Sequence, residues 1–196
     1  MDHPELARAA VESMAENTAD ADVASIWWGA LTGITGLVLH RAVNTLDAMV
    51  GNRSPRHARF GTVSARMDDL ANLVPARITG ATACLLAPLV GGSIGESWRI
   101  MRRDASKHPS PNGGWCESAW AGALGVHLGG RNVYFLRVET RPLLGDGPRP
   151  GSTELRNATR LVSAVTAATG AAAALGLLVS ARFNRRMGRR KQMSQR

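Results

Sequence analysis

The sequence predicts an all-α, polytopic integral membrane protein with two or three membrane helices. The main evidence is three uncharged apolar runs, which span residues 23–39, 78–95 and 161–181. A spanning helix needs roughly 20 apolar residues; the third run meets this length alone, and the first two meet it with their flanks. Gly29 and Gly33 have the spacing that lets two helices approach closely. We therefore expect a single membrane domain over residues 1–196, with shorter amphipathic or re-entrant helices and polar loops. A soluble protein with buried Ala-rich helices is the alternative.

The net charge of +9 comes almost entirely from arginine, since Lys107 and Lys191 are the only lysines. Such a charge is also typical of nucleic-acid-binding proteins. However, the chain also has apolar runs of membrane length. The basic segment 182–196 is therefore better explained as the cytoplasmic flank of a membrane helix. We expect this tail to be disordered, the protein to lie in the inner cell membrane as a multi-pass protein, and nucleic acid not to be a partner. A basic membrane-surface or nucleic-acid-binding protein is the competing interpretation.

An amphipathic helix is predicted over residues 5–20, before the first apolar helix at 23–43. Its acidic residues Glu12, Glu16 and Asp20 follow one another at intervals of four, so they share one face. Like charges at this spacing destabilise a helix unless a cation or a basic partner lies against them. The stripe is either a binding surface or a solvated acidic face.

A dense polar segment, residues 60–77, leads directly into the second apolar run. Asp68 and Asn72 would lie one turn apart on a helix, with Asp69 beside them. Pro75 is expected to end that helix or to begin the next. Charge beside a membrane span is costly and so points to a function, although a solvated turn is the simpler alternative.

The stretch between the second and third apolar runs contains a Pro- and Gly-rich loop, residues 104–115. A short helix is predicted after it, over residues 117–128, and is expected to end at Gly129 and Gly130. Counting three spans gives two basic loops on opposite sides of the membrane. Either the second apolar run is re-entrant or helix 117–128 enters the membrane, and the sequence leaves both open.

Familiar catalytic motifs are missing from the sequence, which has no Walker loop, no Gly-x-Ser-x-Gly and no His-Glu-x-x-His. The two cysteines, Cys84 and Cys116, match neither a disulfide framework nor a cysteine-based zinc site. What the loops offer is carboxylates, amides and arginines. Carboxylates suit Mg²⁺, and arginines suit phosphate or carboxylate groups.

Five motifs in order resemble the adenosylcobinamide-phosphate synthases of cobalamin biosynthesis, the CobD/CbiB type. They are VESMAENTAD, RAVNTLDAMVG, FGTVSARMDDLANLVPAR, RRDASKHPSPNGGWCESAWAGALGVHLGG and RPLLG. Relative to that family, the usual N-terminal membrane spans are missing before Met1. The resemblance implies a membrane enzyme that uses ATP to join a corrinoid, adenosylcobyric acid, to aminopropanol or its phosphate through an amide bond. It implies no tightly bound cofactor, because the corrinoid is the substrate.

The resemblance extends to individual polar residues. We expect catalytic roles for Glu16, Asp68, Asp69, Asn72 and His108. We expect substrate-binding roles for Asn17, Asn44, Asp47, Arg66, Arg77, Asp104, Ser110, Asn112 and Glu117. Glu12 and Asp20 lie in the same motifs.

Chemistry suggests a role for each kind of group. Asp68 and Asp69, with Glu16 or Asp47, would hold Mg²⁺ and the nucleotide. Arg66 and Arg77 would neutralise the phosphate of an activated acyl group, and His108 would accept the amine proton. A homo-oligomer, or pairing with a separate N-terminal half, would complete the assembly. The alternatives are an inactive fragment and a non-enzymatic membrane sensor or assembly subunit.

Overall fold

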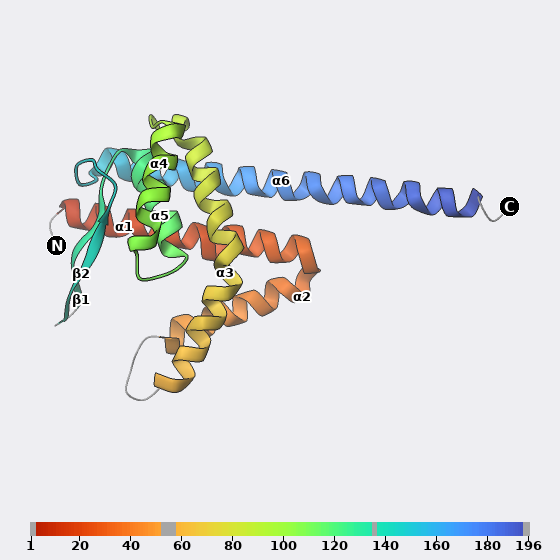
Figure 1. The fold of residues 1–196 in the computed structure, drawn as a ribbon, viewed down its shortest axis with the longest axis horizontal. Helices are drawn as coiled ribbons and strands as arrows, with labels where there is room; N and C mark the ends of the chain where they lie inside the picture. Colours follow the sequence, from red (N-terminus) through yellow and green to blue (C-terminus); the bar gives the residue numbers. More distant parts are fainter. Residues whose placement is uncertain (1–2, 52–57, 135–136, 194–196) are drawn as a thin grey trace.

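The computed structural model describes residues 3–51, 58–134 and 137–193 (Figure 1). Its α-helices are α1 (His3–Asn17), α2 (Ala24–Leu46), α3 (Ala58–Leu86), α4 (Ile94–Asp104), α5 (Gly113–Leu124) and α6 (Ser152–Met193). Short π- and 3-10 helices adjoin them at η1 (Thr18–Val23), η2 (Asp47–Gly51), η3 (Ala87–Val90) and η4 (Ala105–Lys107). A hairpin of strands β1 (Leu128–Tyr134) and β2 (Arg137–Leu144) precedes α6.

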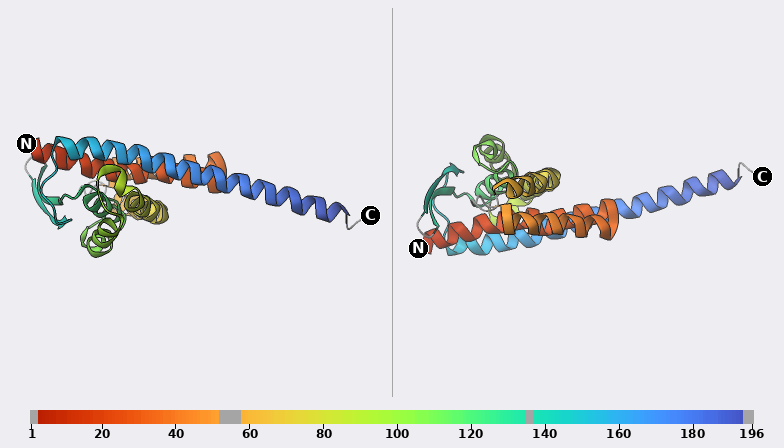
Figure 2. Two further views of the ribbon diagram at one scale, coloured as in Figure 1. Left: turned by 90° about the horizontal axis from the view of Figure 1, so that it is seen from above. Right: turned by 90° about the horizontal axis from the view of Figure 1, so that it is seen from below.

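Three helical stretches are long and apolar enough to cross a membrane, which confirms the predicted fold class. They are Glu5–Gly51, Gly61–Val90 and Ser152–Phe183. In the most apolar window of the last stretch, only 6% is buried against the rest of the protein. Figures 1 and 2 show why, since α6 extends far beyond the other elements. The helix α6 also runs through the basic segment as far as Met193, where the sequence suggested a disordered tail.

The sequence predicted one continuous helix over residues 23–43. In the structure this helix is interrupted at Gly33. Gly33 has φ 70° and ψ −156°, and the chain reverses there (Figure 1). Only glycine adopts this backbone region at little cost. The N-terminal part of α2 therefore continues the line of α1, and the part after Gly33 returns toward α3.

Pro75 lies inside α3, so the prediction that it ends or begins a helix is wrong. A proline has no N–H for the carbonyl four residues earlier, which here is that of Ala71. The indole Nε1 of Trp28 donates to this Ala71 oxygen at 3.1 Å. A side chain from α2 thus supplies the hydrogen bond that Pro75 cannot make, and α3 continues.

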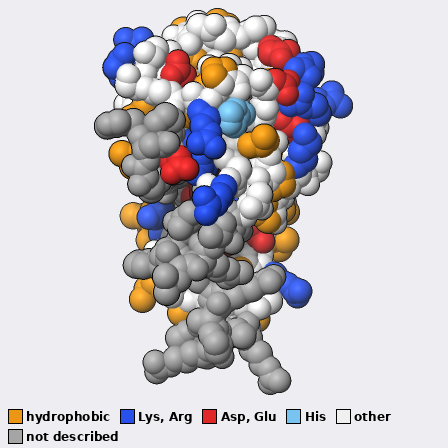
Figure 3. All heavy atoms as spheres, turned by 90° about the vertical axis from the view of Figure 1, so that its left-hand side faces the viewer, with side chains coloured by type: hydrophobic (Ala, Val, Ile, Leu, Met, Phe, Trp, Pro, Cys, Tyr) orange, Lys and Arg blue, Asp and Glu red, His pale blue; other side chains and the backbone are white. Residues whose placement is uncertain are grey.

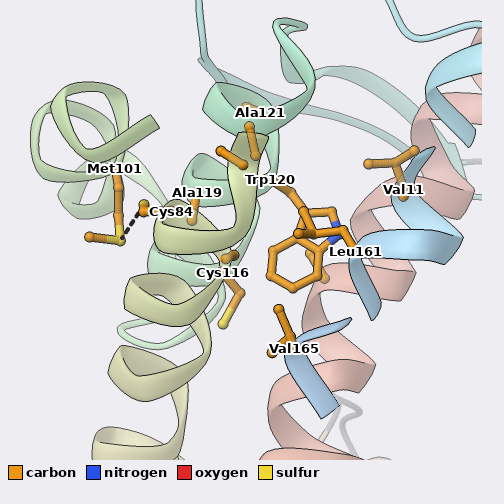
Figure 4. Packing of buried hydrophobic residues seen from close by; sticks show 14 of the residues in the cluster. Val11, Cys84, Met101, Cys116, Ala119, Trp120, Ala121, Leu161 and Val165 are labelled. Carbon is orange, nitrogen blue, oxygen red and sulfur yellow. Dashed lines mark hydrogen bonds between the residues drawn. The ribbon is translucent and has the colours of Figure 1, made fainter. Parts of the chain in front are cut away.

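The core forms around α5, whose side chains are buried from Gly113 almost to its end. Trp120 points from α5 toward Leu161 and Val165 of α6, as Figure 4 shows. A Cβ on Gly122 would lie 2.6 Å from Cα of Ser97. Glycine there is what lets α5 approach α4 so closely. This buried helix begins and ends four residues earlier than predicted, because Gly125 at φ 65° ends it.

The β-hairpin is the element that the sequence analysis did not predict. Its strands are antiparallel, with an irregularity between Leu128 and Gly130. Gly129 and Gly130, expected to end a helix, lie in β1. Two acidic side chains from helices accept hydrogen bonds from backbone N–H groups of the hairpin region. Glu12 accepts the N–H of Gly129 at 2.7 Å, and Asp104 accepts that of Gly145 at 2.8 Å.

Candidate functional site

A pocket of about 590 Å³ lies between the N-terminal helices, α3 and the loop before α5. We call it the acidic pocket because five of the residues lining it are carboxylates, with one arginine. Its lining residues are Glu16, Ala19, Asp20, Asp47, Gly51, Ala65, Asp68, Asp69, Pro109, Ser110, Pro111, Asn112, Gly113, Cys116 and Arg141. Carboxylates gathered in this way repel one another, so the pocket favours a cationic ligand.

Helix irregularities and small residues bring these carboxylates together. Asp20 lies in the π-helix η1 and Asp47 in the π-helix η2. Single π-turns within helices are frequent at functional sites. A Cβ on Gly61 would lie 2.1 Å from the Val50 carbonyl oxygen. The start of α3 can therefore pass close to the end of η2 only because residue 61 is glycine.

Asp68 is oriented by two amides. Asn44 donates to one carboxylate oxygen of Asp68 and Asn72 donates to the other, both at 3.1 Å. The Asn72 carbonyl oxygen in turn lies 2.9 Å from Nε2 of His40. We call Asn44, Asp68, Asn72 and His40 the Asp68 network. Both oxygens of Asp68 thus face defined partners, as is typical of carboxylates that also bind a cation.

His40 is a member of this network that the sequence analysis did not assign. It is buried, and it lies on α2 four residues before Asn44 and seven before Asp47. That spacing places all three on one helical face. The spacing was therefore the signal that could have identified His40.

Arg77 holds the loop before α5 in place. Its guanidinium donates to Oδ1 of Asn112 at 3.0 Å and to the carbonyls of Leu73 and Pro111. It also lies over the ring of Trp115, 5.0 Å from the centroid. Asn112 completes the connection by donating to the Asp69 carbonyl at 2.7 Å. Arg77 and Asn112 therefore join the loop to α3.

A trio of titratable residues, Glu16, His108 and Glu117, lies at the wall of the acidic pocket. Nε2 of His108 is 3.3 Å from Oε1 of Glu117. Burial lowers the pKa of His108, but the hydrogen bond and charge of Glu117, helped by the Ser110 backbone and Glu16, outweigh it and raise that pKa overall. Glu16 lines the pocket, whereas His108 and Glu117 lie behind its wall.

Two predicted substrate-binding residues, Asp104 and Ser110, make structural contacts within the chain. Asp104 is buried and pairs with Arg103 at 2.6 Å and with Lys107 at 2.6 Å. Burial raises the pKa of Asp104, but Arg103, the Gly145 N–H and Lys107 outweigh it and hold that pKa well below its usual range. Ser110 lines the pocket, and its hydroxyl also accepts the backbone N–H of Gly113 at 3.0 Å, at the start of α5.

The remaining predicted residues lie away from the pocket lining. Asn17 and Arg66 are exposed. Asn17 donates to the hydroxyl of Ser13 at 3.0 Å. Glu12 pairs with Arg8 at 2.7 Å, so the three acidic residues of α1 and η1 divide into one paired residue and the pocket carboxylates Glu16 and Asp20.

An exposed ion-pair cluster lies near the hairpin. Asp146 pairs with Arg99 and Arg103, and Glu96 pairs with Arg99. Hydrogen bonds from Arg103 and Arg99 lower the pKa of Asp146 to about 2. Figure 3, which views the molecule from the hairpin end, shows acidic and basic side chains adjoining there. Exposed pairs contribute little stability, and none of these four residues lines the acidic pocket.

Comparison with known proteins gives a consistent result. Residues 1–162 match the family described as CobD/Cbib protein. The chain is 51% identical over 176 residues to a "Cobalamin biosynthesis protein CobD" of Mycobacterium tuberculosis (strain ATCC 25618 / H37Rv), covering 90% of this chain and 56% of that protein. It is 48% identical over 163 residues to the protein of that name in Geobacter metallireducens, covering 83% of this chain and 51% of the relative.

The chain thus spans about half the length of the curated relatives it matches. No solved structure matches it. The family match covers the whole acidic pocket and every predicted site residue, since all of them lie before residue 162. On this evidence, the chain belongs to the CobD/CbiB protein family.

Proposed function

We propose that this chain takes part in cobalamin biosynthesis as a membrane amide synthase. It would use ATP to join the carboxylate of adenosylcobyric acid to the amine of aminopropanol or its phosphate. The observation that supports this most strongly is the acidic pocket, in which Asp68 is held by two amides beside four further carboxylates. The names of the relatives, "Cobalamin biosynthesis protein CobD", support a role in cobalamin biosynthesis.

The residues present fit Mg²⁺ with a nucleotide. Asp68 and Asp69 are adjacent on α3 and both line the acidic pocket. Carboxylate oxygens are the ligands that Mg²⁺ prefers, usually one or two together with phosphate oxygens. When bound, the ion neutralises phosphate charge. Asn44 and Asn72 orient Asp68 for that contact, and Asp47 adds negative charge at the same wall.

The phosphate-binding role moves from Arg77 to Arg141 in this proposal. Arg77 is engaged with the loop before α5 and does not line the pocket, and Arg66 is exposed elsewhere on α3. Arg141 of β2 is the arginine that lines the pocket. We assign it to the phosphate that leaves when the activated carboxyl is attacked, because a guanidinium matches phosphate geometry.

The proton acceptor also changes. His108 lies behind the pocket wall, with a side chain only 4% exposed. Asp20 lines the pocket and stands outside the Asp68 network. We assign to Asp20 the proton released as the amine nitrogen forms its bond to the carbonyl carbon and the carbon–oxygen bond to phosphate breaks.

The test is a coupling assay with the detergent-purified chain, adenosylcobyric acid, Mg²⁺, ATP and aminopropanol phosphate or aminopropanol. Mass spectrometry would detect the amide product. A parallel reaction adds the polypeptide encoded immediately upstream in the same genome, because the chain spans about half of its relatives. ATP-dependent product in either reaction supports the proposal. No product in both, with the protein folded, contradicts it and favours a non-enzymatic relative.

A further inference from the structure

The trio Glu16, His108 and Glu117 has the composition of a metal site that is separate from Asp68 and Asp69. One ligand atom each of Glu16, His108 and Glu117 lies within 4.8 Å of the other two. The three come from α1, the loop before α5, and α5 itself. Segments far apart in the sequence therefore converge on one point. Convergence alone is weak evidence, since acidic groups often cluster without an ion.

The second observation is that two buried polar atoms of the trio have no partner among the described residues except each other. His108 and Glu117 side chains are only 4% and 1% exposed. Nε2 of His108 and Oε1 of Glu117 face each other as an ion pair at 3.3 Å, and neither has a further hydrogen-bond partner among the described residues. Buried polar atoms that lack well-formed hydrogen bonds carry a desolvation cost. A ligand that binds both atoms would remove this cost.

The separation of these two atoms suits a metal ion. Ligand atoms about 2.0–2.1 Å from Zn²⁺ in a tetrahedral site lie about 3.3 Å apart. His108 Nε2 and Glu117 Oε1 are 3.3 Å apart. The other ring nitrogen, Nδ1, accepts the Ser110 backbone N–H at 3.0 Å and lies 3.3 Å from the Ser110 carbonyl oxygen. Metal binding at Nε2 requires the tautomer protonated at Nδ1, which would donate to that carbonyl instead.

Glycines make room for the trio. A Cβ on Gly113 would lie 3.0 Å from Cε1 of His108 and 3.1 Å from Oε1 of Glu16. A Cβ on Gly114 would lie 2.7 Å from Cβ of His108. Both glycines stand at the start of α5. The loop can therefore press His108 against Glu16 and Glu117 only because these two positions lack side chains.

We propose that Glu16, His108 and Glu117 bind a divalent first-row transition-metal ion, with Zn²⁺ as the best match. One imidazole and two carboxylates suit Zn²⁺ better than Mg²⁺, which prefers oxygen ligands alone. Three protein ligands leave a fourth position open for water or substrate. Because Glu16 lines the acidic pocket, an ion held by the trio would lie beside that pocket. The inference does not depend on amide synthesis.

The experiment measures Zn²⁺ binding to the full chain in detergent after dialysis against a chelator. Calorimetry gives the affinity, and elemental analysis gives the ratio of zinc to protein. We expect one ion per chain. H108Q, E117Q and E16Q should each weaken binding at least about tenfold, since even outer-shell partners have effects of 10–100-fold. Mg²⁺ in excess should not displace the zinc.

Two control variants separate this site from general acidity. H127Q removes a histidine that contacts the Gly147 carbonyl instead of the trio, and D68N removes a pocket carboxylate outside it. Both should bind Zn²⁺ like the unmodified chain. E16Q is the variant for which misfolding is the smallest concern, because Glu16 is only partly buried. The proposal would be overturned if Zn²⁺ binding were not saturable, or if D68N lost Zn²⁺ binding while E16Q kept it. The helical signal in circular dichroism shows which variants fold.

Discussion

Asn72 joins two helices through one buried amide. Its nitrogen donates to Asp68, and its oxygen lies 2.9 Å from Nε2 of His40 on α2. The residue is 1% exposed, so water cannot replace either contact. A single side chain thereby positions a pocket carboxylate and gives Nε2 of a buried histidine its hydrogen-bond partner.

We expect N72A to lower the free energy of unfolding by about 1–3 kcal/mol, because it removes the partner of buried His40 Nε2 and one of the two amides bound to Asp68. Thermal unfolding in detergent would measure this. N17A is the matched control, since Asn17 is exposed and contacts only Ser13 among the described hydrogen bonds. Equal melting temperatures for the two variants would show that the Asp68 network does not stabilise the fold.

Asp104 leads to a prediction about pH. Its folded-state pKa is lowered because Arg103, the Gly145 N–H and Lys107 outweigh the effect of burial. A carboxyl with a lowered folded pKa contributes stability above its unfolded pKa, about 3.9, and that contribution is lost as pH falls through the folded value.

The wild-type melting temperature should therefore fall below about pH 4 in part through Asp104. D104N should melt lower at pH 7 and show a shallower decline between about pH 4 and pH 2. Melting curves recorded across this range would test it. Parallel curves for the two proteins would mean that Asp104 adds nothing to the acid sensitivity.

At the scale of elements, α3 depends on a contact from α2. Trp28 donates to the Ala71 carbonyl that Pro75 leaves without its helical partner. W28F should destabilise the protein by about 1 kcal/mol, because that carbonyl becomes unpaired. In the P75A background, where residue 75 regains an N–H, the same substitution should cost less.

A double-mutant cycle in chemical denaturant measures this coupling. The four proteins are the unmodified chain, W28F, P75A and the double variant. If W28F has the same effect in both backgrounds, the indole does not substitute for the missing helical hydrogen bond.

The elements divide into those that the sequence could predict and those it could not. The apolar runs predicted three stretches of membrane length because hydropathy over such a window depends on composition alone. The reversal at Gly33 and the passage of α3 through Pro75 depend on tertiary contacts, which local propensity does not contain. The hairpin did have a local signal, since Val133, Tyr134 and Val138 are typical strand residues.

At the scale of the whole molecule, the acidic pocket unites residues from Glu16 to Arg141. Many of these residues could be predicted from the resemblance to a family, because sequence motifs record which residue types occur. Motifs do not record where the side chains lie in space. It could not show that Arg77 and Asn112 hold a loop, that Asp104 pairs with Arg103, or that His108 lies behind the wall. Those distinctions depend on the orientation of each side chain.

The central claim is that Asp68 and its pocket perform the chemistry. The most direct measurement compares D68N with E96Q in the coupling assay, each in whichever reaction yields product with the unmodified chain. Glu96 is an exposed carboxylate paired with Arg99 and lies outside the pocket. We predict that D68N loses at least about 100-fold in turnover, as expected when a group that stabilises transferred charge is removed, while E96Q keeps full activity. Equal turnover in the two variants, with both folded, would contradict the account.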